Sequence, residues 1–149
     1  MMGKPYILLV EDNPDDVDLT MRAFEKNRIV NEIVVVRDGA LACEFLFKES
    51  PSHANGLPAL ILLDLNLPKV SGLEVLERVR SNEATRLLPT VILTSSKQDE
   101  DLIRGYQLGV NSYVRKPVDF NAFVEAVRQV GLYWLVLNEP PPRAGGGGM

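Results

Sequence analysis

The stretch Leu60-Ile61-Leu62-Leu63-Asp64 decides the fold class of this chain, because an acid directly follows four consecutive apolar residues. A short, continuous apolar run is typical of a strand that is buried on both faces, as strands of parallel sheets are. Four further segments have the same strand-like character. They are Tyr6–Val10, Ile33–Val36, Thr90–Leu93 and Ser112–Arg115. The sequence therefore predicts five strands.

Segments with helical periodicity separate the predicted strands and follow the last one. Ser71 stands at capping-box spacing from Glu74, and Gly109 follows the fourth helical segment, so these residues predict a helix start and a helix end. Strands that alternate with helices predict right-handed crossovers and a parallel sheet. Four of the predicted helices are marked by apolar residues at helical spacing: Val17, Met21 and Phe24 in the first; Leu41, Phe45 and Leu46 in the second; Leu73, Leu76 and Val79 in the third; and Leu102, Ile103, Tyr106 and Leu108 in the fourth. A fifth helix is predicted over about 119–137.

Length and composition fit one domain. The 149 residues are 46% hydrophobic and 24% charged, which suits a globular protein with a single core. We expect a folded domain over residues 1–138 and a disordered Pro/Gly-rich tail over residues 139–149, whose glycine run could also be non-native. A net charge of -4 without a basic block argues against nucleic acid, and no apolar run is long enough to cross a membrane. No export signal is visible, and Cys43 is the single cysteine, so we expect a cytoplasmic protein.

Polar residues follow four of the five predicted strands at the same end. Glu11 and Asp12 follow the first strand, Asp64 the third, Thr94 the fourth and Lys116 the fifth. Each of these residues alone is more often a turn or capping residue than a catalytic one. Open α/β sheets, however, bind ligands beyond the carboxyl ends of their strands, so the whole set predicts a site at that edge.

Three acids and one ammonium at this edge predict a metal ion and phosphoryl chemistry. Acids in one small space repel each other, and a hard dication relieves that repulsion. Mg²⁺ takes one or two carboxylates and leaves room for phosphate oxygens, whereas Ca²⁺ needs more oxygen ligands and Zn²⁺ needs His or Cys. With the charge neutralised, Asp64 can attack a phosphoryl group and form an aspartyl-phosphate. Lys116 and the Thr94 hydroxyl can then bind the equatorial oxygens.

Five short motifs follow one another along the chain. They are Leu-Val-Glu-Asp-Asn at 9–13, Leu-Leu-Asp-Leu-Asn-Leu-Pro at 62–68, Ser-Gly at 71–72, Leu-Thr-Ser at 93–95 and Tyr-Val-Arg-Lys-Pro at 113–117. In this order and on these elements, the motifs resemble the receiver domain of two-component response regulators. The resemblance covers roughly Tyr6 to Val136, and it implies a (βα)5 doubly wound, flavodoxin-like fold with a parallel five-stranded sheet of order 2-1-3-4-5.

The resemblance also implies the residues that bind the metal. Asp64 would be the phospho-acceptor and a Mg²⁺ ligand. Glu11 and Asp12 would be the acid pair that binds the ion, and Asn66 would supply a backbone carbonyl. The pair is Glu-Asp here, where many relatives have Asp-Asp. The longer Glu11 side chain could therefore reach Mg²⁺ through water only.

A second group of residues would carry the response to phosphorylation. By resemblance, Lys116 pairs with the phosphoryl group, and Thr94 is the switch hydroxyl that moves toward it. Tyr113 would be the rotating aromatic residue that swings inward as Thr94 moves. The peptide bond before Pro117 would be cis. Ser95 replaces the alanine that is frequent after the switch threonine.

The function expected from the resemblance is that of a stand-alone, single-domain response regulator, similar to chemotaxis regulators. A sensor histidine kinase would phosphorylate Asp64, and the protein would catalyse only its own phosphorylation and dephosphorylation. The surface formed by the fourth strand, the following helix, the fifth strand and the last helix would then change for partner binding. The Tyr133-Trp134-Leu135 run and the Pro-rich end show a weaker resemblance to regulators paired with phytochromes and other hybrid kinases. The apolar run 132–137 predicts either a helix end that the chain's own tail buries or a homodimer surface.

Three other functions fit parts of the sequence. An aspartate-based phosphohydrolase needs its nucleophile after the first strand and a second acid, but Asn66 cannot protonate a leaving group. A flavodoxin-like carrier needs a phosphate-binding loop after the first strand, where this chain has acids. A receiver that acts without phosphorylation is disfavoured because every key position is filled.

Overall fold

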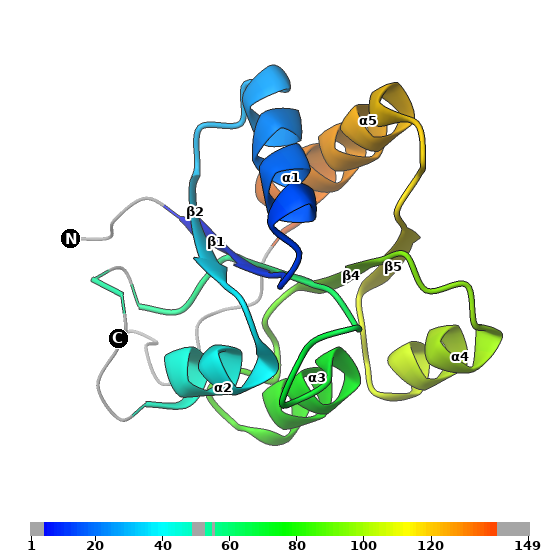
Figure 1. Ribbon diagram of the computed structural model, residues 1–149. Coiled ribbons are helices and arrows are strands. Elements are labelled where there is room, and N and C mark those ends of the chain that lie inside the picture. Colours follow the sequence, from blue (N-terminus) through cyan, green and yellow to red (C-terminus); the bar gives the residue numbers. More distant parts are fainter. Residues whose placement is uncertain (1–4, 49–52, 55, 140–149) are drawn as a thin grey trace.

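Five parallel strands form the central sheet of the computed structural model, which describes residues 5–48, 53–54 and 56–139. Their order in the sheet is β2-β1-β3-β4-β5, so the predicted order 2-1-3-4-5 is confirmed (Figure 1). The strands are β1 Tyr6–Val10, β2 Glu32–Val36, β3 Leu60–Leu63, β4 Thr90–Thr94 and β5 Ser112–Arg115. The chain reverses its direction of travel across the sheet after β2, so β1 and β3 lie side by side at the switch point in strand order.

Helices cover both faces of the sheet. Figure 1 shows α1 and α5 on one face, and α2, α3 and α4 on the other. The helices are α1 Pro14–Lys26, α2 Gly39–Phe47, α3 Gly72–Ser81, α4 Asp99–Gln107 and α5 Phe120–Gly131, which a π-helical segment, η1 Leu132–Leu137, continues. This arrangement is the doubly wound fold that the alternation of strands and helices predicts.

The core consists of two apolar layers, one on each side of the sheet. Successive side chains of a strand point to opposite faces, so a strand that is apolar throughout contributes to both layers. In β1, Leu8 and Val10 pack toward α2 and α3, whereas Ile7 and Leu9 pack toward α1 and α5. All residues of β1, β3 and β4 are buried. This burial explains why β1 and β3 are unbroken apolar runs in the sequence, and why β4 is apolar between its two terminal threonines.

Side-chain caps fix where four of the helices begin. The Ser71 hydroxyl accepts from the Glu74 N–H at 3.3 Å, which confirms the predicted start of α3. The Glu74 carboxylate pairs with Arg78, so the cap is not the reciprocal box that the spacing allowed. Gly109 has φ +92 directly after α4, as its predicted helix-ending role requires. The other capping side chains are Asn13, Asp38 and Asp119.

The last helix differs from the single α-helix predicted over about 119–137. It is α-helical to Gly131 and π-helical over Leu132–Leu137. Gly131 passes close to α1's end, since an added Cβ there would lie 2.4 Å from Ile29 Cδ1. The wider turn brings both Trp134 and Leu135 against the apolar layer beneath α5. The predicted tail of 139–149 lies outside the described residues, apart from Glu139.

Among the described residues, no helix is both long and apolar enough to cross a membrane. Cys43 is buried on α2 as a free thiol, and burial raises its pKa. A buried thiol of this kind packs as a small apolar side chain.

Candidate functional site

The site lies at the carboxyl ends of four strands, as the sequence predicts. Val10 and Leu63 are paired in register on β1 and β3, so the residues that follow them, Glu11 and Asp64, emerge side by side. Thr94 ends β4 and pairs with Arg115 of β5. The Lys116 N–H then donates to the Thr94 carbonyl oxygen at 2.8 Å, which extends the sheet contact by one residue. Parallel strands thus bring all these side chains to one edge.

Three carboxylates gather at this edge in what we call the acid cluster: Glu11, Asp12 and Asp64. Each offers one oxygen, and these oxygens all lie within 4.8 Å of one another. Glu11 is 2% exposed and Asp64 is 6% exposed, so two of the three charges have little water to stabilise them. Oxygen ligands at this spacing fit a hard dication that keeps part of its water shell, as Mg²⁺ does.

The Glu11 carboxylate is held in place at both oxygens. Its Oε1 lies 2.5 Å from Lys116 Nζ, and its Oε2 accepts from the Asn13 N–H at 3.3 Å. Burial raises the pKa of Glu11, the negative charge of Asp64 raises it further, and Lys116 lowers it, so that the result is about 7. In the absence of a cation, this carboxyl therefore keeps its proton close to neutral pH.

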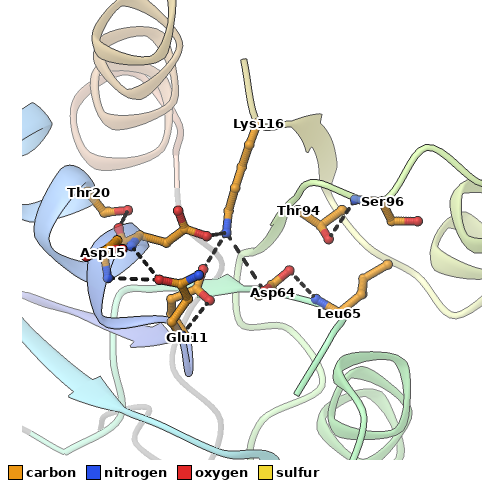
Figure 2. Close-up of polar contacts among 10 residues, drawn as sticks. Glu11, Asp15, Thr20, Asp64, Leu65, Thr94, Ser96 and Lys116 are labelled. Carbon is orange, nitrogen blue, oxygen red and sulfur yellow. Dashed lines mark hydrogen bonds and ion pairs between the residues drawn. The ribbon is translucent and has the colours of Figure 1, made fainter. Parts of the chain in front are cut away.

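Lys116 reaches the acid cluster from the end of β5 and is almost fully buried, with 8% of its side chain exposed (Figure 2). Its ammonium lies 2.8 Å from Asp16 Oδ2 and 3.8 Å from Asp64 Oδ2. Burial alone would lower the pKa of Lys116, but its bonds to Asp16 and Glu11 and the charge of Asp64 outweigh burial and raise it. Lys116 is therefore a permanent positive charge beside Asp64.

The Asp64 carboxylate has one oxygen fixed and one oxygen facing the ammonium. Oδ1 accepts from the Leu65 N–H at 2.8 Å, which sets the orientation of the carboxylate. Oδ2 faces Lys116 at 3.8 Å, too long for a hydrogen bond. The Asp64 carboxylate thus has a defined orientation, and its Oδ2 lies at the edge of the sheet without a hydrogen bond to Lys116.

Thr94 lies on the other side of Asp64 from Lys116, and its hydroxyl is fully buried (Figure 2). Thr94 Oγ1 accepts from the Ser96 N–H at 3.3 Å. The Ser96 hydroxyl donates to Asp101 Oδ2 at 2.6 Å, which links the β4–α4 loop to the first turn of α4. A movement of the Thr94 side chain would therefore break the hydrogen bond from the Ser96 N–H in this loop.

Tyr113 on β5 has a buried hydroxyl that, within the described part of the chain, has no hydrogen-bond partner. Burial raises the pKa of Tyr113, and the negative charge of Asp101 raises it further. The nearby Ser96 lowers the pKa of Tyr113 in part. The Ser96 hydroxyl itself donates its hydrogen bond to Asp101 and not to Tyr113. The ring packs beside Gly105 of α4, where an added Cβ would lie 3.3 Å from Tyr113 Cδ2. The inward swing expected of Tyr113 on phosphorylation stays a prediction.

The loop between β3 and α3 passes so close to two glycines that no side chain fits there. A Cβ on Gly72 would lie 2.1 Å from the Asp64 carbonyl oxygen, and one on Gly39 would lie 1.8 Å from the Val70 carbonyl oxygen. Lys69, in the same loop, has φ +68. Asn66 lies exposed in the turn after β3, and its metal-ligand role stays a prediction. The glycines hold the loop that carries Asp64 and Asn66 against its neighbours.

One predicted feature of the site is wrong, and one residue was missed. The Lys116–Pro117 bond, expected to be cis, is trans, since residues 5–48, 53–54 and 56–139 contain no cis peptide bond; the trans form is the intrinsically preferred one even before proline. Asp16 was not predicted, although it bonds Lys116 more closely than Asp64 does. The available signal was helical spacing: Asp16, Thr20 and Ala23 share the inward face of α1.

Comparisons with known proteins identify relatives over most of the chain. The family model of the response regulator receiver domain matches residues 7–128. The probable methanogenesis regulatory protein FilR2 of Methanothrix harundinacea is 43% identical over 91% of this chain and 86% of its own. The response regulator Rcp1 of a Synechocystis strain is 37% identical over 87% of this chain and 88% of its own.

Solved structures give the same match in three dimensions. The phosphorylated cyanobacterial phytochrome response regulator RcpA superposes with a TM-score of 0.86 at 35% identity, covering 94% of this chain and all of that one. The Mn²⁺-bound form of Rcp1 has a TM-score of 0.83 at 36% identity, over 93% and 99% of the two chains. The bacteriophytochrome response regulator RtBRR is 51% identical, with a TM-score of 0.73 over 95% of this chain and 86% of that one.

Proposed function

The chain belongs to the response regulator receiver domain family, and we propose that it accepts a phosphoryl group on Asp64 from a sensor histidine kinase. One observation supports this assignment above the others. The Asp64 carboxylate lies at the carboxyl end of a central strand, within 4.8 Å of two further acids and 3.8 Å from a buried ammonium. Its orientation is fixed by the Leu65 N–H, which leaves Oδ2 for reaction.

A divalent cation, Mg²⁺ by this chemistry, would be held by Glu11, Asp12 and Asp64, with the Asn66 carbonyl as a further ligand. When bound, the ion supplies positive charge that neutralises the acids and the transferred phosphoryl oxygens. Four carboxylates, those of the acid cluster and Asp16, lie at this edge with one ammonium, which leaves three negative charges in excess when all are ionised. The structure of Rcp1 with Mn²⁺ shows that a relative holds a dication.

The transfer step balances without another reactant. An Asp64 carboxylate oxygen attacks the phosphorus of a phosphohistidine, a P–O bond forms, and the P–N bond to the donor imidazole breaks. The imidazole leaves with the electron pair of that bond and takes a proton from water. Lys116 and the Thr94 hydroxyl lie on either side of Asp64, where they can donate to the phosphoryl oxygens (Figure 2). The protein thereby catalyses only its own phosphorylation and, with water as nucleophile, its dephosphorylation.

The response to phosphorylation would pass from Thr94 to the surface of β4, α4, β5 and α5. Thr94 is tied to Ser96, and Ser96 is tied to Asp101 of α4. If Thr94 moves toward the phosphoryl group, the Ser96 N–H loses its acceptor and the loop before α4 rearranges. Tyr113 borders that loop with a hydroxyl that is ready to take a new partner. The charge added to Asp64 would thus change the packing of the loop between β4 and α4.

The kinase partner would be a phytochrome or a hybrid kinase, because the relatives with solved structures include phytochrome and bacteriophytochrome response regulators. We place this exchange in the cytoplasm, where the ATP that charges a kinase is made. The last helix would support a homodimer, since Val136 is 68% exposed and Leu137 is 65% exposed on η1. Light scattering over a concentration series, with and without a phosphodonor, tests this surface: a monomer throughout would remove the dimer.

Chemical trapping tests the phospho-acceptor directly. After phosphorylation, borohydride reduces an aspartyl-phosphate to homoserine, which peptide mass mapping locates. We expect homoserine at position 64 and unchanged aspartate at positions 12, 15 and 16. Homoserine at any other position, or phosphate retained on a stable ester, would overturn the assignment. Turnover of phosphate monoesters by the wild-type protein would instead favour a phosphohydrolase.

A further inference from the structure

Lys116 is bound by a carboxylate that has no part in the predicted metal site. Asp16 Oδ2 lies 2.8 Å from Lys116 Nζ, a full ångström closer than Asp64 Oδ2 at 3.8 Å. The Asp16 side chain is 30% exposed, whereas that of Lys116 is 8% exposed. The ammonium therefore rests on the side of the site toward α1, short of the oxygen on which the phosphoryl group would be carried.

The first turn of α1 places Asp16, and not its neighbours, at this point. Asn13 caps the helix by accepting from the Asp15 and Asp16 N–H groups at 2.8 and 3.2 Å, which fixes how the turn begins. Thr20, one turn further along, is buried and bonds the Asp16 carbonyl oxygen at 2.7 Å. Asp15 is exposed, and no ion pair of its side chain occurs in the described part of the chain. Asp15 and Asp16 are thus a matched pair of acids that differ in their contact with Lys116.

We propose that Asp16 is a positioning residue that competes with the phosphoryl group for Lys116. Of the two acids that Lys116 bonds, Glu11 is an expected metal ligand, whose charge a bound cation would neutralise. Asp16 then remains as the carboxylate that holds the ammonium. To reach a phosphoryl oxygen on Asp64, the ammonium must weaken its bond to Asp16. The affinity of the site for a phosphoryl group is therefore reduced by the share of time that Lys116 spends on Asp16.

This inference rests on the proposed phosphorylation of Asp64, and it concerns how strongly the product state is favoured. Removing the Asp16 carboxylate would free Lys116 for the phosphoryl group. The same substitution also removes a negative charge near an anionic ligand, which by itself favours binding. A test must therefore separate the loss of competition from the loss of repulsion.

Beryllofluoride, which mimics a phosphoryl group on aspartate, provides such a test at equilibrium. Its affinity is measured by calorimetry at saturating Mg²⁺, and the Mg²⁺ affinity of each variant is measured separately. We expect Asp16→Asn to bind beryllofluoride about fivefold more tightly than the wild type, which corresponds to about 1 kcal/mol. The matched control Asp15→Asn should change it by less than about twofold, because an exposed charge is screened by solvent.

The same pair of variants in a Lys116→Met background separates the two effects. Competition predicts that Asp16→Asn gives no gain without Lys116, whereas simple repulsion predicts that the gain persists. The titration is extended to millimolar beryllofluoride so that weakened binding is still measured. Equal or weaker binding by Asp16→Asn, or a gain that survives in Lys116→Met, would overturn the inference. A wild-type protein that binds no beryllofluoride would instead count against the proposed function itself.

Discussion

Glu11 and Lys116 form an ion pair that is buried on both sides: 2.5 Å separates the two atoms, and 3% and 8% of the two side chains are exposed. The two residues are far apart in the sequence and meet because β1 and β5 end at the same edge of the sheet. A buried pair of this kind is weak evidence for stability, since desolvation offsets much of the attraction. The pair holds in one place the carboxylate that we propose binds Mg²⁺ and the ammonium that we propose binds a phosphoryl group.

The pKa of Glu11 predicts a pH-dependent affinity for Mg²⁺. Because burial raises this pKa from 4.5 to about 7, a cation must displace a proton from Glu11 below that pH. We expect the Mg²⁺ affinity to rise with pH up to about 7 and then to level off. Calorimetric titration of Mg²⁺ at a series of pH values measures this. Glu11→Gln should bind more weakly and lose the dependence, and an equally steep dependence in that variant would contradict the assignment.

The same shift predicts how the stability of the metal-free protein changes with pH. The folded state binds the Glu11 proton more tightly than the unfolded state does, so the contribution of Glu11 is largest below pH 4.5. That contribution is lost as the pH rises from 4.5 to about 7. Urea unfolding in EDTA should therefore show a slope in this window that Glu11→Gln lacks. Saturating Mg²⁺ should reverse the loss above pH 7, since binding to the folded state stabilises it.

Replacement of Lys116 by methionine should destabilise the metal-free protein in a pH-dependent way. The substitution leaves the buried carboxylates without their cation, and an unsatisfied buried group costs about 1–3 kcal/mol. We expect a loss of this size at pH 8 and a smaller loss at pH 5.5, where Glu11 carries its proton. Chemical unfolding at both pH values gives the two free energies. Lys97→Met, on an exposed lysine, serves as the control. An equal loss at both pH values would mean that lost packing, and not lost charge, accounts for the effect.

Gly72→Ala should damage the site through the backbone. An added Cβ would lie 2.1 Å from the Asp64 carbonyl oxygen and 2.7 Å from Leu65 Cα, so the loop after β3 must shift. Overpacking of this kind costs about 1–3 kcal/mol, and here it also displaces the proposed phospho-acceptor. Thermal unfolding and Mg²⁺ titration should both show the change. Gly105→Ala meets its nearest atom, on the Ile92 side chain, at 3.1 Å and should cost less; the reverse order would contradict this reading of the loop.

Tyr113→Phe should leave the folded protein as stable as the wild type or more stable. The hydroxyl of Tyr113 is buried and without a partner in the described residues, so its removal relieves a cost of about 1–3 kcal/mol at most. Urea unfolding of both proteins without a phosphodonor measures the difference. A clear destabilisation would show that the hydroxyl makes a stabilising hydrogen bond in solution. The response to phosphorylation can still weaken in this variant, because the hydroxyl is then absent when the loop before α4 rearranges.

The sequence predicted the sheet because its order follows from local signals. Continuous apolar runs marked the three central strands, and the alternation with helices left one common topology. Residues that directly follow strands, such as Glu11, Asp64 and Lys116, were predictable as neighbours, since parallel strands end at one edge. Their order along the chain then identified the family.

Features that depend on tertiary packing were not predictable. Helical spacing places Asp16 on the inward face of α1, but its 2.8 Å contact with Lys116 depends on how α1 packs in the folded protein. The last helix becomes π-helical over Leu132–Leu137, directly after Gly131, which packs close to Ile29, a residue far away in the sequence. The bond before Pro117 is trans although the resemblance implied cis, and the sequence alone allows both isomers before proline.

The central claim is that Asp64 takes a phosphoryl group in a reaction that needs a divalent cation. Intact-mass spectrometry after incubation with acetyl phosphate and Mg²⁺ tests it most directly, with EDTA and Asp64→Ala as controls. The account predicts a gain of about 80 Da, one phosphoryl group, in the wild type with Mg²⁺, and no gain in either control. A gain that persists in Asp64→Ala, or that forms equally well in EDTA, would contradict it.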